Sequence, residues 1–139
     1  MEKLKINNKN QNYYIDVCTS CRDRVMPREP LSQRPGYKLF NALKDKLATS
    51  NLNGIVEVRP AECLSICKRP CGISISSLGS WAYLFGDQQP QTSVEEIIEV
   101  LRLYIKNQCG IMRREDRPEG FQSSILGKIP PNGAANVSS

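Results

Sequence analysis

The sequence predicts a mixed α/β (α+β) domain, in which a small mixed sheet of about four strands packs against two main helices. Short runs rich in β-branched and aromatic residues recur along the chain, bounded by Gly, Pro, Asn or Ser. Two longer segments instead repeat apolar residues at helical spacing. The chain has 139 residues, of which 40% are hydrophobic, and this is enough to bury a single core.

The first half of the chain is predicted to form a strand, a helix and a second strand. Residues 13–17 ("YYIDV") are β-prone and lead directly into Cys18. A helix is expected over residues 37–50, because apolar residues recur there at helical spacing and a glycine follows its end. The second strand is expected at residues 55–59, with Pro60 helping to end it.

The second half is predicted to form a hairpin and a closing helix. Residues 73–76 and 81–85 flank "SLGS", which has the composition of a hairpin turn. Trp81, Tyr83 and Phe85 alternate at the strand period, which is typical of one face of a packed sheet. The helix expected over residues 92–107 has Thr92 or Ser93 as its cap and two glutamates in its first turn, where the helix dipole favours negative charge.

Composition predicts three parts along the chain. Residues 1–12 form a polar N-terminal extension, residues 13–108 the folded domain, and residues 109–139 a C-terminal arm. The arm begins with charged residues and becomes rich in Pro, Gly, Asn and Ser, so we expect its end to be disordered.

The N-terminus and the charge pattern indicate the compartment and exclude some partners. No apolar run of signal-peptide type and no membrane-spanning segment is present, so we expect a soluble cytoplasmic protein. The net charge of +5 is spread along the chain, and no strip of alternating basic and aromatic residues indicates nucleic acid binding. In a reducing compartment, clustered cysteines are more often metal ligands or redox thiols than disulfides.

Five of the six cysteines fall into two groups, namely Cys18 with Cys21, and Cys63 with Cys67 and Cys71. The first pair has a spacing that lets both sulfurs face one metal centre. In the second group the cysteines are four residues apart, but Pro70 argues against a helix and favours a loop. Loops at the ends of adjacent strands can converge. The pattern therefore predicts a soft-metal site, either an iron–sulfur cluster or a structural zinc.

The absence of histidine narrows the chemistry further. It excludes mixed Cys and His zinc sites, Cys-His nucleophile pairs, Ser-His-Asp triads and Rieske-type centres. No other residue set resembles a substrate-transforming site, so we expect a metal-binding protein or electron carrier and not an enzyme. Cys109 stands apart from both groups and is expected to be a packed, non-ligating residue.

The order of elements and the motif "ECLSICKRPCGI" resemble the thioredoxin-like 2Fe-2S ferredoxins. In that group a loop of "CLGxC" type supplies two ligands, matched here by Cys63 and Cys67, and the first loop supplies two more, matched by Cys18 and Cys21. The first pair is usually spaced more widely in those proteins, and a proline is typical at the position of Cys71. The motifs "VCTSCR", "RPG", "CLSICKRPC", "W-Y-LFGD" and "RPEGF...IPP" are also similar to a bacterial family described as predicted metal-binding proteins of unknown function.

The resemblance implies a thioredoxin-like fold and a 2Fe-2S cluster bound by Cys18, Cys21, Cys63 and Cys67. Spacing leaves Cys71 open as an alternative ligand, a redox thiol or a packed residue. The protein would then transfer electrons to or from a redox partner or carry the cluster, and a homodimer is expected by analogy. Two alternatives stay open. One is a binding module in which the same four cysteines hold zinc. The other is a thiol oxidoreductase that uses Cys18 and Cys21 as its active dithiol.

Overall fold

A single mixed sheet forms the centre of the structure. The computed structural model describes residues 13–20, 30–64, 71–89 and 92–131. The strands are ordered β2-β1-β3-β4-β5, where β1 and β2 are parallel and the other neighbours are antiparallel. Their bounds are β1 Tyr13–Cys18, β2 Val56–Ala61, β3 Ile73–Ser77, β4 Ala82–Phe85 and β5 Ile125–Ile129. The predicted fold class is confirmed, with one more strand than expected.

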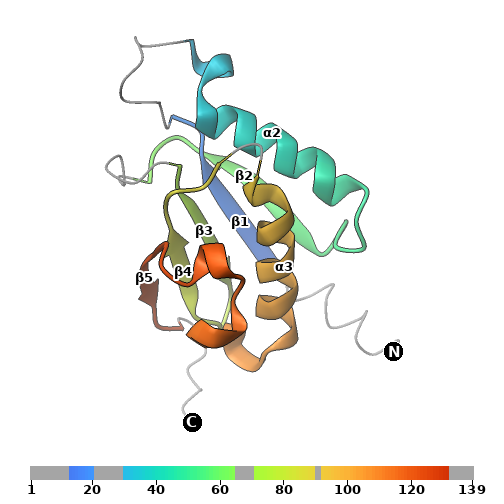
Figure 1. The fold of residues 1–139 in the computed structure, drawn as a ribbon. Helices are drawn as coiled ribbons and strands as arrows, with labels where there is room; N and C mark the ends of the chain where they lie inside the picture. The colour runs from blue at the N-terminus through green and yellow to red at the C-terminus, as the bar shows by residue number, and fades with distance from the viewer. Residues whose placement is uncertain (1–12, 21–29, 65–70, 90–91, 132–139) are drawn as a thin grey trace.

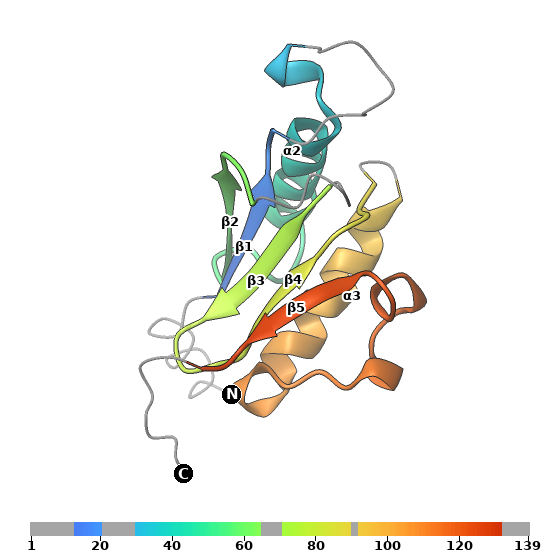
Figure 2. The same ribbon diagram turned by 90° about the vertical axis from the view of Figure 1, so that its left-hand side faces the viewer.

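The two long helices pack on the same face of this sheet, as Figure 2 shows. They are α2 (Pro35–Ala48) and α3 (Ser93–Lys106). The first helix begins two residues before the predicted start, because Pro35 has the fixed backbone angle that suits a first helical turn. Before α3, the Ser93 Oγ accepts a hydrogen bond from the Gln89 backbone N–H at 2.9 Å.

The core lies between the helices and the inward-facing residues of the three central strands. Strand residues alternate across the sheet, so every second side chain faces the helices. Tyr83 and Phe85 are buried with their ring centroids 6.0 Å apart, which confirms the prediction that they face the core, whereas Trp81 lies before β4 and is half-buried. The helices contribute Leu39, Leu43, Leu47, Ile97, Val100, Leu101 and Tyr104 to this core.

Pro60 does not end β2, contrary to the sequence-based expectation. The strand continues to Ala61, and Pro60 is paired with Val17 of β1. The reason is that β2 is an edge strand, where a residue without an N–H group removes no hydrogen bond from a second neighbour.

The segment after α3 folds back along that helix and supplies the fifth strand (Figures 1 and 2). Three short 3₁₀ turns, η2 (Gln108–Gly110), η3 (Arg114–Asp116) and η4 (Glu119–Phe121), precede β5. Phe121 is fully buried, and its ring packs edge-on against Phe85 at 4.8 Å between centroids. Most of the described part of the predicted arm is thus packed on the domain, while the expected N-terminal extension and the expected disorder at the chain's end fall outside the described residues.

Within the described ranges, neither α2 nor α3 nor any other helix has the length and apolar character needed to cross a membrane.

Candidate metal centre

The two cysteine-bearing segments meet at one edge of the sheet, namely the edge formed by the carboxyl ends of the parallel strands β1 and β2. Cys18 is the last residue of β1 and is paired in the parallel ladder with Ala61, the last residue of β2. Thr19 ties the two strand ends together, because its N–H and its Oγ1 both donate to the Ala61 carbonyl, at 2.9 and 3.2 Å. Cys63 follows two residues later and is exposed. The loops that carry Cys18 and Cys63 therefore begin side by side.

Cys71 belongs to the same edge. It precedes β3, and the neighbouring Gly72 accepts a hydrogen bond from the Cys18 N–H at 3.0 Å. Cys18 and Cys71 are both buried, with 2% and 3% of their surfaces exposed. The ends of β1 and β2 and the start of β3 thus bring Cys18, Cys63 and Cys71 to the same end of the sheet.

The loop between β4 and α3 covers Cys71, which the sequence did not predict. Cys71 and Gln88 exchange two backbone hydrogen bonds, of 3.3 and 3.1 Å. Gln88 is itself buried, and its Nε2 donates to the Gly86 carbonyl at 2.8 Å. Between them, Asp87 adopts a left-handed backbone with φ of 61°, which Asp tolerates better than most residues. In the sequence, the end of the motif "LFGD" marks where this loop begins.

An ion pair joins β1 and β2 close to the same edge. The Arg59 Nε and Nη2 donate to the two carboxylate oxygens of Asp16, at 2.7 and 3.1 Å. This hydrogen bond with Asp16 raises the pKa of Arg59, and the guanidinium also lies 4.2 Å from the centre of the Tyr14 ring. The pair holds the two parallel strands together where their cysteine-bearing loops begin.

Two of the four predicted ligands, Cys21 and Cys67, lie outside the described residues. Among the residues that the structure does describe, no three Cys, Asp or Glu side chains form a group that could hold a metal ion. The assignment of all four ligands is therefore still a prediction. The donor chemistry fits a cluster or a thiolate-bound zinc, because Cys18 and Cys63 begin loops at one edge and their sequence partners follow within four residues.

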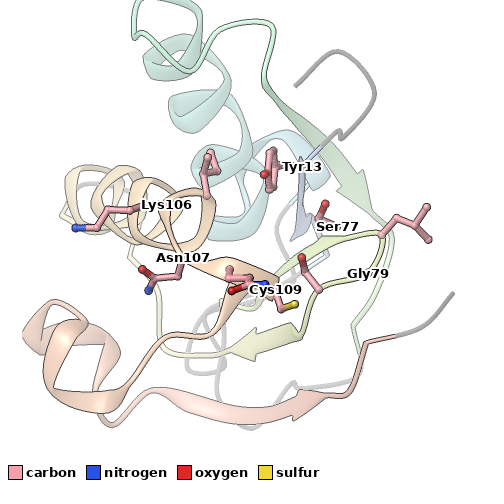
Figure 3. A pocket seen from close by; sticks show the side chains of 10 residues that line it. Tyr13, Ser77, Gly79, Lys106, Asn107 and Cys109 are labelled. Carbon is pink, nitrogen blue, oxygen red and sulfur yellow. The ribbon is translucent and has the colours of Figure 1, made fainter. Parts of the chain in front are cut away.

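Cys109 lies at the opposite end of the sheet from this edge. It lines a pocket of about 480 Å³ together with Tyr13, the first residue of β1, and the turn around Gly79 (Figure 3). The six residues of β1 separate that end from Cys18 by about 17 Å. Cys109 is exposed and not packed as expected. Its carbonyl accepts a hydrogen bond from the Trp81 N–H at 2.8 Å, and its backbone is left-handed with φ of 58°.

The fold is thioredoxin-like. A thioredoxin-like [2Fe-2S] ferredoxin from Aquifex aeolicus superposes with a TM-score of 0.57 at 21% sequence identity, covering 88% of this chain and 96% of that chain. A crystal structure of the wild-type thioredoxin-like [2Fe-2S] ferredoxin from the same organism gives a TM-score of 0.48 at 18% identity, covering 68% of this chain and 86% of that chain. Among curated proteins, none matches this chain.

Residues 15–131 match the family described as "Protein of unknown function (DUF1636)". The chain belongs to this family. The matched range begins in β1 and ends after β5, so the C-terminal segment is part of the family's sequence pattern as well as of the sheet.

Proposed function

We propose that this protein is a thioredoxin-like 2Fe-2S ferredoxin that transfers electrons or carries the cluster, with Cys18, Cys21, Cys63 and Cys67 as its ligands. One observation carries the proposal: the parallel pairing of Cys18 with Ala61 starts both cysteine-bearing loops at the same edge of the sheet. The name of the structurally similar Aquifex protein gives further support.

The chain supplies an asymmetric setting for such a group. A bound 2Fe-2S cluster would accept and release one electron at a time. Cys18 is buried and would keep water from the inner side of the site, whereas Cys63 is exposed and would face a redox partner. Solvent exposure and hydrogen bonds to sulfur both set the reduction potential, so this asymmetry would contribute to it.

Cys71 would act as an alternative ligand. It is buried beside the Cys18 segment, and its backbone N–H and carbonyl are both hydrogen-bonded to the backbone of Gln88. A fifth thiol at the same end of the sheet is positioned to replace a lost ligand. In Cys67→Ser we therefore expect part of the iron to be retained, and in the double variant with Cys71→Ser we expect that part to be lost.

Anaerobic purification, followed by iron, sulfide and zinc analysis, tests the proposal. We expect about two iron and two sulfide per chain, and visible absorption that bleaches with dithionite. Cys63→Ser combined with Cys71→Ser should lose most of this absorption, because the two changes remove a ligand and the thiol that could replace it. Cys109→Ser is the matched control and should keep it, since Cys109 lies at the other end of β1.

Other results would support the alternatives. A colourless protein with one zinc per chain would indicate a zinc-stabilised binding module. Metal-free protein that reduces disulfides, and loses this activity in Cys18→Ser, would indicate a thiol oxidoreductase. The cytoplasmic location, the redox partner protein and the homodimer stay predictions; size-exclusion chromatography with light scattering tests the last.

A further inference from the structure

Arg117 is a buried cation whose Nε has no partner among the described residues. The residue opens the "RPEGF" motif between η3 and η4, and only 8% of its surface is exposed. Its Nε is buried and has no hydrogen-bond partner in the part of the chain that the structure describes. Burial lowers the pKa of Arg117, the Tyr83 phenol opposes this shift, and the nearby Arg114 adds to it. An uncompensated buried charge is unfavourable, so this arrangement calls for an anion.

The acidic residue next to Arg117 does not compensate its charge. The Asp116 carboxylate instead accepts a hydrogen bond from the Arg113 Nε at 3.2 Å. Gln122 approaches Arg117 from the other side, but its Nε2 donates to the Arg117 backbone carbonyl at 3.1 Å and leaves the guanidinium untouched. The local contacts therefore fix the backbone of Arg117 and leave its side-chain charge unmatched.

Arg117 lines a cleft of about 370 Å³ between α3 and the C-terminal segment. This volume lies in the range of small-molecule sites. The other lining residues are Glu99, Arg102, Leu103, Lys106, Asp116 and Pro118. Three cations and two carboxylates leave the lining with one net positive charge, and Asp116 is already paired with Arg113. Arg102 donates a hydrogen bond to the Asn51 Oδ1 at 3.0 Å, a neutral acceptor that leaves the positive charge of Arg102 in place.

We infer that this cleft binds a small oxyanion, a carboxylate or phosphate group, with Arg117 as its principal partner and Lys106 at the rim. A guanidinium is suited to this task because its N–H groups match pairs of anionic oxygens. An anion in the cleft compensates the buried charge that the described residues leave unpaired. The site uses none of the cysteines, so it stands independently of the proposed cluster.

Thermal unfolding of the full-length protein with inorganic phosphate or succinate, against chloride at matched ionic strength, tests this inference. At ten times its dissociation constant, a ligand of the folded state stabilises by RT ln 11, which raises the unfolding midpoint by roughly 3–8 °C in a domain of this size. A rise with phosphate alone, or with succinate alone, identifies which oxyanion the cleft takes.

Arg117→Met keeps an apolar stem and removes the charge, so it should abolish the anion-dependent rise without lowering the midpoint in chloride. Arg114→Gln is the matched control, since it removes the same charge from an exposed residue that does not line the cleft. Lys106→Gln should also reduce the rise, and this variant replaces Arg117→Met in the test if Arg117→Met does not fold. The inference is overturned if the wild type shows no rise, or if Arg117→Met or Lys106→Gln rises as much as Arg114→Gln.

Discussion

Phe121 should be a major anchor of the C-terminal segment. Its ring is fully buried and lies edge-on to Phe85, 4.8 Å between centroids. Truncating a buried phenylalanine to alanine costs about 3–5 kcal/mol, of which the aromatic pair accounts for about 1 kcal/mol. With a total stability of about 5–15 kcal/mol, Phe121→Ala should remove about a fifth or more of the free energy of unfolding.

Urea unfolding followed by far-UV circular dichroism measures this loss. At an m-value of about 2 kcal/mol per molar urea, the midpoint of Phe121→Ala should fall by about 1.5–2.5 M. Leu78→Ala is the control; this leucine is 81% exposed, and the change should stay within about 0.5 kcal/mol. A loss of less than about 1 kcal/mol in Phe121→Ala would show that the segment is not packed on the domain as described.

Three further predictions follow from single contacts. Gly110→Ala should lower the free energy of unfolding by about 2–4 kcal/mol, because its backbone has φ of 69° and an added Cβ would overlap the Tyr104 ring. Gly54→Ala is the control, since Gly54 has φ of 86° but open space around it, and should cost only about 1–2 kcal/mol. Equal losses of stability in urea unfolding would refute the overlap. Burial raises the pKa of Tyr104 above its ordinary 10.0, so the phenol ionises more readily in the unfolded chain, and stability should fall as pH rises above about 10. The fall should be smaller in Tyr104→Phe. Equal falls in the wild type and in this variant, measured by urea unfolding, would contradict the prediction. Asp16→Asn should lower the free energy of unfolding by at most about 1 kcal/mol, and by less in 1 M salt, because the ion pair with Arg59 is partly exposed. A larger loss that does not change with salt would mean that solvent and salt do not screen this pair.

Local patterns predicted most of the fold correctly. The hairpin followed from "SLGS" and both helices from apolar spacing, since these signals come from residues close together in sequence. β5 was missed because "ILGKI" is a short run interrupted by glycine and lysine, and it is stabilised by pairing with β4 across about forty residues of chain. Pro60 was misjudged for a similar reason, because only the strand order reveals that β2 lies at the edge.

The candidate site was predictable in part. Cysteine spacing predicted that two loops converge, and the pairing of Cys18 with Ala61 puts the starts of those loops together. The contact of Gln88 with Cys71 was not predictable, because it consists of backbone hydrogen bonds and the side chains in the sequence do not indicate them. The burial of Arg117 without a carboxylate partner was not predictable either, because a sequence shows an arginine but not whether a carboxylate lies opposite it.

The most direct test of the proposed centre is diffraction from anaerobically grown crystals, with anomalous data collected at the iron absorption edge. Two adjacent iron atoms bonded to the Sγ atoms of Cys18, Cys21, Cys63 and Cys67 are the predicted result. No iron signal at that edge of the sheet, or a single zinc bound by those sulfurs, would contradict it.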